Sequence, residues 1–244
     1  MIPIVFAFHA EQLHDDNVWR RTERVARYMT KKGLQAVFFV YPFRAQVAGR
    51  DITDRVRTLA ALGHEIGQHT HFYAGTNIDK LEKVDDLSEA NIIHCLYRDF
   101  ETLQRMGFSP QGFTAGAWMV TETVLNTLVE LGFTYDCSAC FPKPKGMTSS
   151  PYRRWLWSPQ LYSNTKGCLL SLPSTCRLGE WFKWGRGVQS KNQVPYQLIY
   201  LHDYDLLGPH VYLLLWYFLA FTRSRRFMPV HILIKRIEEK EAHD

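Results

Sequence analysis

The chain has 244 residues, of which 46% are hydrophobic and 22% are charged, and its formal net charge is +5. This composition allows a sizeable core and excludes a disordered chain. The five cysteines are odd in number and irregularly spaced, which excludes a disulfide-framework protein and favours a reducing compartment.

The N-terminal segment and the longest apolar run bear on location. Residues 1–8 are apolar but lack the basic segment and cleavage site of a signal peptide. The apolar run over residues 211–221 is too short to span a bilayer. The basic residues are scattered, so we expect no nucleic-acid partner. We therefore expect a cytoplasmic protein with a single domain over residues 1–244.

Helices and strands are expected to alternate along the whole chain. Gly33, Gly63, Gly107 and Gly132 each follow an amphipathic segment, and glycine after a helix end closes the helix in the left-handed conformation. The expected helices cover residues 16–32, 51–62, 88–106, 120–131 and 210–224. The expected strands cover residues 4–8, 36–41, 65–68, 112–115, 135–138, 169–172 and 197–201.

This alternation predicts the fold class. Several strands are continuous apolar runs, as in parallel strands that are buried on both faces. We expect a distorted or incomplete (β/α) barrel with about seven parallel strands. Residues 141–167 lack a helical pattern and are interpreted as a long loop, and residues 224–237 as a final short strand and helix.

Several histidines and carboxylates follow the expected strands directly. His69 and His71 are two residues apart, so on an extended segment both imidazoles face the same side. Glu11 follows the first strand, and in a parallel barrel the carboxyl ends of the strands share one rim. Two histidines and one carboxylate are a recurrent ligand set of hydrolytic metal centres. Glu11, His69 and His71 are therefore the candidate metal ligands.

Other polar residues near these strand ends have both a functional and a structural interpretation. His9 ends a buried strand and is either a catalytic group or a hydrogen-bonded core histidine. His202 ends the last apolar strand and precedes Asp203, which favours a functional role. Glu11 has the alternative of capping the next helix, and His64 is expected to be structural because it directly follows a helix end.

Five segments in this order resemble motifs of the polysaccharide deacetylase family, which is carbohydrate esterase family four. The most specific match is residues 63–70, Gly-His-Glu-Ile-Gly-Gln-His-Thr. The other segments that are similar to family motifs are residues 36–40, 112–118, 131–138 and 199–202.

The resemblance implies a function and assigns roles. Members of the family remove acetyl groups from N-acetylated sugars with the help of one divalent metal, which we expect to be zinc. By this resemblance, His9 stands at the position of the catalytic base and His202 at that of the catalytic acid. Trp118, Asp136 and Tyr73 lie in or next to the similar segments and are expected to bind substrate.

The sequence also departs from the family pattern at three positions. The family's base is an aspartate where His9 stands, so His9 is either a histidine base or a further metal ligand. An arginine that orients this aspartate in the family is replaced by Thr114. The second metal-binding histidine of the family would fall on Tyr73, whereas the second histidine here is His71. The aspartate and the arginine act together, so their joint loss suggests a rewired site.

Two functions follow from these observations. The first is a metal-dependent hydrolase of an N-acetylated sugar, with a nucleotide-linked or lipid-linked precursor of surface polysaccharide such as O-antigen as substrate. The second is a catalytically inactive, carbohydrate-binding relative of the deacetylases. The apolar helix expected over residues 210–221 is either buried against the barrel or contacts a second copy of the chain or a membrane surface.

Overall fold

The computed structural model describes residues 2–72, 88–142, 152–184, 196–222 and 226–241. One curled sheet organises these residues, with the strand order β6-β7-β5-β4-β3-β2-β1-β9-β8. All neighbouring strands are parallel except the β6–β7 pair. The strands are β1 (Ile4–Ala10), β2 (Val37–Val40), β3 (Glu65–Thr70), β4 (Gly112–Ala115), β5 (Tyr135–Asp136), β6 (Gln160–Asn164), β7 (Gly167–Ser171), β8 (Cys176–Arg177) and β9 (Gln197–His202).

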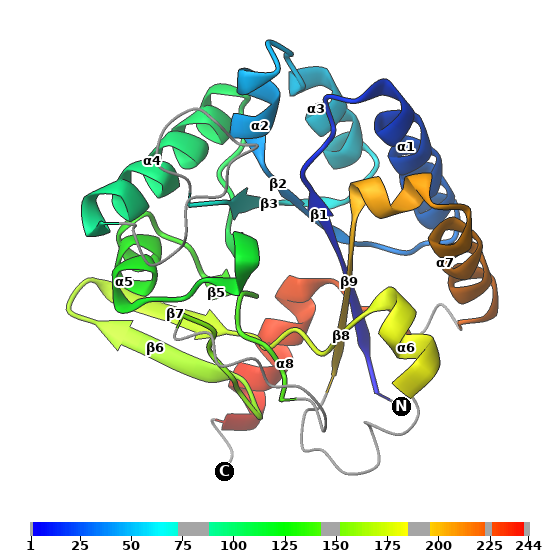
Figure 1. The fold of residues 1–244 in the computed structure, drawn as a ribbon. Helices are drawn as coiled ribbons and strands as arrows, with labels where there is room; N and C mark the ends of the chain where they lie inside the picture. The colour runs from blue at the N-terminus through cyan, green and yellow to red at the C-terminus, as the bar shows by residue number, and fades with distance from the viewer. Residues whose placement is uncertain (1, 73–87, 143–151, 185–195, 223–225, 242–244) are drawn as a thin grey trace.

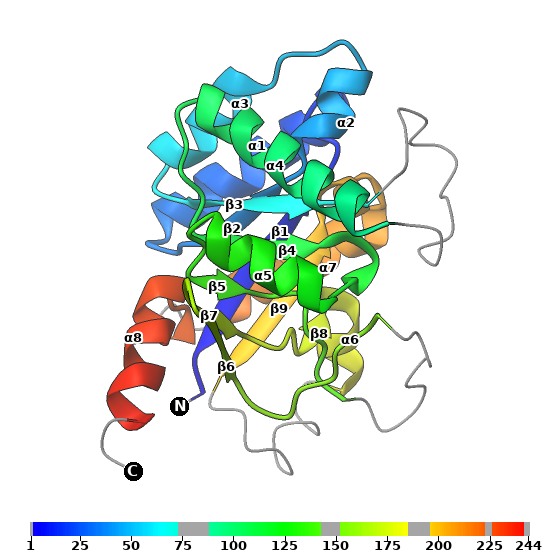
Figure 2. The same ribbon diagram turned by 90° about the vertical axis from the view of Figure 1, so that its left-hand side faces the viewer.

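Helices surround this sheet, and the fold is a distorted, incomplete (β/α) barrel (Figure 1). Its carboxyl strand ends point toward the viewer in Figure 1 and to the right in Figure 2. The helices are α1 (Asp16–Lys31), α2 (Pro42–Val47), α3 (Thr53–Ala61), α4 (Glu89–Arg105), α5 (Glu122–Glu130), α6 (Leu178–Trp184), α7 (Pro209–Phe221) and α8 (Val230–Glu241), with the short 3₁₀ helices η2 (Gly116–Trp118) and η3 (Asp203–Leu207).

All seven expected strands and all five expected helices are present, with small shifts at their ends. The prediction of a continuous loop over residues 141–167 was wrong, because β6 lies within it and pairs with β7 as a hairpin. Strand β6 is largely exposed, so its sequence lacks the apolar run that marks a buried strand. The short elements α2, α6 and β8 were not expected either.

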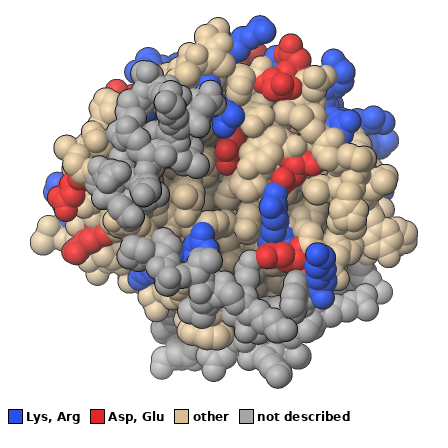
Figure 3. Space-filling model, in the orientation of Figure 1, with Lys and Arg blue, Asp and Glu red and all other residues tan. Residues whose placement is uncertain are grey.

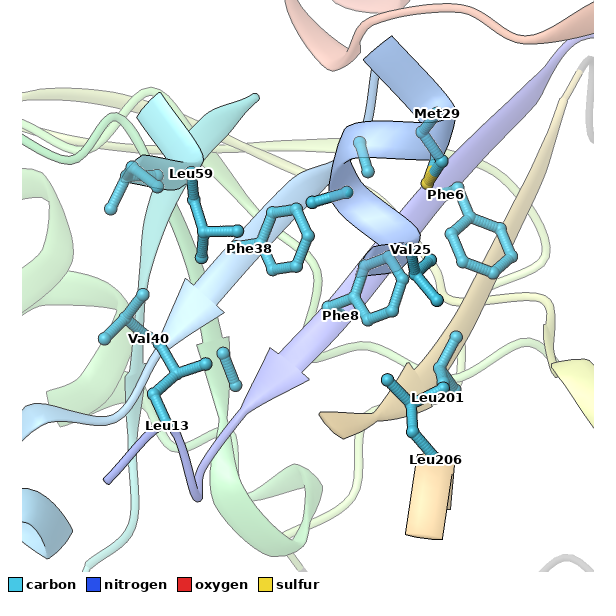
Figure 4. Packing of buried hydrophobic residues seen from close by; sticks show 14 of the residues in the cluster. Phe6, Phe8, Leu13, Val25, Met29, Phe38, Val40, Leu59, Leu201 and Leu206 are labelled. Carbon is cyan, nitrogen blue, oxygen red and sulfur yellow. The ribbon is translucent and has the colours of Figure 1, made fainter. Parts of the chain in front are cut away.

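The two faces of β1 have different surroundings. Phe6 and Phe8 point outward and pack on Val25 and Met29 of α1 (Figure 4). The alternating residues Val5 and Ala7 belong to a second apolar cluster inside the barrel, together with residues of α8. Because side chains alternate along a strand, His9 follows Val5 and Ala7 on the inner face.

Helix α8 closes the barrel at the end where the strands begin (Figure 2). Val230, Leu233 and Ile237 of α8 are buried in the inner cluster. The barrel interior at the end where the strands begin is therefore packed mainly with apolar side chains. The interior at the carboxyl ends of the strands is left for polar groups. None of the helices that the structure describes is long and apolar enough to cross a membrane.

Candidate metal centre

Five polar side chains converge at the carboxyl ends of β1, β3 and β9. They are His9, Glu11, His69, His71 and His202, and their ligand atoms form two overlapping groups that share Glu11. The strand register explains part of this convergence, because His9 of β1 lies directly opposite His202 of β9. Parallel strands whose inner faces end at one rim bring residues together that are far apart in the sequence.

Glu11 lies at the centre of this cluster. Its Oε1 atom is 3.3 Å from Nε2 of His69, 3.4 Å from Nε2 of His71 and 3.6 Å from Nε2 of His202. Burial alone would raise the pKa of Glu11, but hydrogen bonds and charges from His69 and His71 hold it far below its usual range. Glu11 is therefore ionised and available as a ligand or hydrogen-bond acceptor.

The spacing of Glu11, His69 and His71 fits one metal ion. Nε2 of His69 and Nε2 of His71 are 3.0 Å apart. Two ligand atoms at about 2.1 Å from one ion, with an angle of about 90° to 110° between them, are separated by about 3.0 to 3.4 Å. The three measured separations of 3.0, 3.3 and 3.4 Å lie in this interval. The donor set of two imidazoles and one carboxylate suits zinc and related divalent ions.

A backbone carbonyl orients His69. Nδ1 of His69 is 2.8 Å from the carbonyl oxygen of Thr114 on the neighbouring strand β4. Because a carbonyl can only accept, Nδ1 carries a hydrogen, and Nε2 is the atom that would give its lone pair to a metal ion. This is the usual arrangement of a metal-binding histidine and its outer partner. The Oγ1 atom of Thr114 is buried with no hydrogen-bond partner among the described residues.

His71 packs closely on Gly116 at the start of η2. A Cβ atom on Gly116 would lie within 2.7 Å of Cδ2 of His71 and still closer to two other ring atoms. The glycine therefore makes room for the imidazole that stands two residues after His69. Sequence reasoning did not single out Gly116, because its role depends on contact with a different loop.

His9 is deeply buried beside the metal-ligand set. Its ring centroid lies 5.0 Å from that of His69 and 5.1 Å from that of His202. Burial lowers the pKa of His9 well below its ordinary value, and the nearby His69 and His202 lower it further. His9 therefore carries a neutral imidazole.

His202 is held by the turn that follows β9. Asp205 Oδ2 lies 3.4 Å from Nδ1 of His202. The same oxygen accepts a 3.0 Å hydrogen bond from the backbone N–H of His202. Arg177 pairs with the other carboxylate oxygen. Although burial acts in the opposite direction, hydrogen bonds from His202 and Arg177 lower the pKa of Asp205 to about 2. The ionised Asp205 carboxylate therefore lies beside Nδ1 of His202, and Nε2 of the same ring lies on the side of Glu11.

Asp203, which directly follows His202, has a structural role. Asp203 is fully buried and accepts a 2.8 Å hydrogen bond from the backbone N–H of Gln12. It ties η3 to the loop after β1, whereas Asp205, three residues after His202, contacts the imidazole.

Aromatic side chains form a wall beside His9. The ring centroid of Trp118 lies 5.5 Å from that of His9 and 4.8 Å from that of Tyr200. Tyr200 stacks on His9 with 5.1 Å between the ring centroids. Ala117 and Trp118 both have positive φ angles, of 53° and 60°. Non-glycine residues rarely adopt this conformation, and it is concentrated at functional sites. Tyr200 was missed in the sequence because it reads as one more residue of an apolar strand.

Asp136, which was expected to bind substrate, is not part of this cluster. Asp136 of β5 is the register partner of Phe113 of β4, so the two side chains lie on the same face of the sheet. That face is the outer one, because Phe113 belongs to the apolar cluster outside the barrel. The Asp136 carboxylate binds the backbone N–H and the hydroxyl group of Ser138. The substrate-binding role of Asp136 therefore stays a prediction without a contact that supports it. Tyr73 lies outside the described residues. His64 is buried away from the rim, where its ring contacts the backbone of Ala26 and Ala36.

Comparison with solved structures places the fold among known ones. A proposed polysaccharide deacetylase from Mycobacterium smegmatis matches with a TM-score of 0.68 and 16% identity, covering 98% of this chain and 92% of the other. A 4-alpha-glucanotransferase from Thermococcus litoralis matches with a TM-score of 0.59 and 14% identity, covering 96% of this chain and 38% of the other. At these identities the likeness concerns the fold alone.

Sequence comparison identifies the family. No curated protein matches the chain. The family model described as polysaccharide deacetylase matches residues 11–135, which is about half of the chain and runs from Glu11 to the start of β5. This range includes the three candidate metal ligands. The chain belongs to the polysaccharide deacetylase family.

Proposed function

We propose that the protein is a metal-dependent hydrolase that removes the acetyl group from the nitrogen of an N-acetylated sugar. The observation that carries this proposal is the convergence of Glu11, His69 and His71 at ligand spacing, with His9 and His202 next to them. Membership of the polysaccharide deacetylase family supports the reaction class. The substrate that we propose is a nucleotide-linked or lipid-linked sugar precursor of surface polysaccharide.

Glu11, His69 and His71 would hold the metal, and we propose zinc. A bound divalent ion would polarise the amide carbonyl and make water more acidic. Glu11 contributes the negative charge that a divalent cation requires, and the Thr114 carbonyl keeps His69 in the ligating tautomer. The partial exposure of His71, at 16% of its side chain, leaves this edge of the cluster open to substrate.

His9 and His202 divide the proton transfers. His9 accepts a proton from the attacking water, because its imidazole lies next to the ligand set, with its ring centroid 5.0 Å from that of His69 and 5.1 Å from that of His202. His202, oriented by Asp205, donates a proton to the nitrogen of the leaving amine. The side chain of His202 is 20% exposed, so it borders both the cluster and the solvent from which the sugar enters.

The proposed aspartate-to-histidine replacement at residue 9 and the loss of the orienting arginine are consistent with each other. A buried aspartate needs a cation or hydrogen-bond donors to remain ionised, whereas a neutral histidine does not. Thr114 stands where the arginine would be, and its contribution here is its carbonyl oxygen, which accepts from His69. Trp118 and Tyr200 hold the His9 ring instead.

The test is acetate release from N-acetylglucosamine oligosaccharides and from a nucleotide-linked N-acetyl sugar by the zinc-loaded protein. We expect Glu11→Ala and His69→Ala to lose bound zinc and activity together. His9→Ala and His202→Ala should keep zinc but lose about 100-fold or more in rate. His94→Ala, at an exposed position of α4, is the matched control and should behave as wild type.

Two results would contradict the proposal. Zinc bound without acetate release from any N-acetyl sugar, together with measurable sugar binding, would identify a carbohydrate-binding relative without activity. Full activity of His9→Ala and His202→Ala would remove both residues from the proposed mechanism.

A further inference from the structure

Helix α7 carries an exposed apolar row that the barrel does not use. Leu213, Tyr217 and Phe221 are 69%, 55% and 72% exposed. They are four residues apart, so they lie on one face of the helix. The opposite face is anchored in the core through Leu215, Phe218 and Leu219, which are buried. Residues 209–221 include no Asp, Glu, Lys or Arg.

The neighbouring helix α1 carries an exposed basic row. Its members are three or four residues apart, so they share the outward face of the helix. This row consists of Arg20, Arg24, Arg27 and Lys31, all of which are exposed, and Arg27 pairs with Glu23 of the same helix. Figure 3 shows Lys and Arg side chains gathered over α1 at the upper right, above an uncharged surface over α7.

The two rows lie on either side of the contact between α1 and α7. Cζ of Arg21 lies over the Tyr212 ring, 5.1 Å from its centroid. The ring centroids of Tyr28 and Trp216 are 4.6 Å apart. On a helical wheel, Arg24 lies about 60° from Arg21 and Leu213 about 100° from Tyr212, each turning away from the core. The apolar row and the basic row therefore belong to one outer surface.

We propose that this surface of α1 and α7 docks on an anionic lipid bilayer. Leu213, Tyr217 and Phe221 would enter the boundary between headgroups and acyl chains, and the basic row of α1 would meet the anionic headgroups. The charge pattern favours this occupant over a second copy of the chain. A two-fold contact that places α7 on α7 and α1 on α1 would bring the two basic rows close together, and like charges repel.

Docking in this way also orients the candidate metal centre. Helix α7 begins at Pro209, only a short turn after His202, and Arg21 of α1 binds the backbone of Leu206 in that turn. The rim that carries His202 is thus attached directly to the docking surface. This inference goes beyond the proposed deacetylase function and does not rest on it.

The experiment is co-sedimentation of the full chain with vesicles of phosphatidylcholine, with and without phosphatidylglycerol. We expect binding to the anionic vesicles, weakened by high salt. The combined substitution Arg20→Gln, Arg24→Gln and Lys31→Gln should weaken binding about 100-fold. The combined substitution Leu213→Gln and Phe221→Gln should weaken it about tenfold or more.

Matched controls separate this surface from general effects. Arg57→Gln, Arg105→Gln and Lys235→Gln remove the same charge from exposed positions elsewhere, and Leu161→Gln replaces a residue that is 61% exposed on β6. Both controls should bind as wild type, and Glu11→Ala should too, because docking needs no metal. Circular dichroism verifies that each variant is folded.

Three results would overturn the proposal. Unchanged vesicle binding by the Leu213 and Phe221 variant would exclude the apolar row. An equal loss in the charge control would reduce the effect to net charge. Absence of vesicle binding by wild type, with a dimer in light scattering that the Leu213 and Phe221 variant dissolves, would identify a second copy as the partner.

Discussion

Replacing Gly116 by alanine should disturb the metal centre from outside the ligand set. The new Cβ would lie 2.7 Å from Cδ2 of His71 and closer to two other ring atoms. Carbon atoms pack at about 3.5 to 4.0 Å, so the imidazole must move by about 1 Å. Metal–ligand distances tolerate only about 0.2 Å, so His71 would no longer ligate in its present position.

The expected size of this effect follows from the loss of one well-placed ligand. We expect zinc affinity to fall about 10-fold to 100-fold, which corresponds to about 1.4 to 2.7 kcal/mol. A competition titration against a coloured zinc chelator measures this change. Gly179→Ala is the control, because a Cβ at Gly179 meets no atom within 4 Å and Gly179 has no positive φ.

Folding and binding must be separated for this variant. The φ angle of Gly116 is not positive, so alanine meets no backbone strain there. We expect Gly116→Ala to remain folded in circular dichroism and His71→Ala to show a similar loss of zinc. Wild-type zinc affinity in Gly116→Ala, with His71→Ala weakened, would refute the packing argument.

The remaining predictions concern Asp205, Asp136 and metal removal. Asp205→Asn should lower kcat of acetate release about tenfold with little change in KM, because His202 loses the carboxylate that orients it. An unchanged kcat would exclude this positioning role. Burial raises the pKa of Asp136 to about 6, so folding favours its protonated form. The contribution of Asp136 protonation to the free energy of unfolding is complete below about pH 4 and is lost as the pH rises through about 6. The total loss is about 3 kcal/mol. Urea unfolding at several pH values should therefore show a smaller loss of stability between pH 4 and 6 for Asp136→Asn than for wild type, and equal slopes would contradict the raised pKa. Finally, zinc removal can be tested on a sample whose free zinc concentration is about 100 times the dissociation constant of the protein for zinc. Removing the zinc should lower the free energy of unfolding by about 2.7 kcal/mol. Thermal denaturation with and without chelator measures this change, and identical curves would mean that the folded chain holds no metal.

The fold followed from local patterns in the sequence. Largely continuous apolar runs marked β1, β2 and β9, and glycines after helices marked the connections between elements. These signals are local, because strand burial and helix ends depend on neighbouring residues. The exposed strand β6 was missed because its pairing with β7 depends on a hairpin and not on an apolar pattern.

The candidate site was predictable only in part. The convergence of Glu11, His69 and His71 was predictable because all three stand at or just after strand ends that share a rim. The face that Asp136 occupies could not, since it depends on the register of β5 against β4. Asp205 was overlooked because a turn of η3 brings it back to His202.

Two further features of the site required three-dimensional packing. The space that Gly116 leaves for His71 involves two loops that are distant in the sequence. The positive φ angles of Ala117 and Trp118, which present the indole ring to His9, are not encoded by glycine or asparagine. Such conformations are held by the surrounding structure, so the local sequence carries no mark of them.

The central claim is that Glu11, His69 and His71 bind one divalent metal. The most direct measurement is the anomalous difference map of a crystal grown with zinc and recorded at the zinc absorption edge. The account predicts one strong peak at about 2.0 to 2.2 Å from a carboxylate oxygen of Glu11 and from Nε2 of both histidines. A map without a peak there, or a peak ligated without Glu11 and His71, would contradict it.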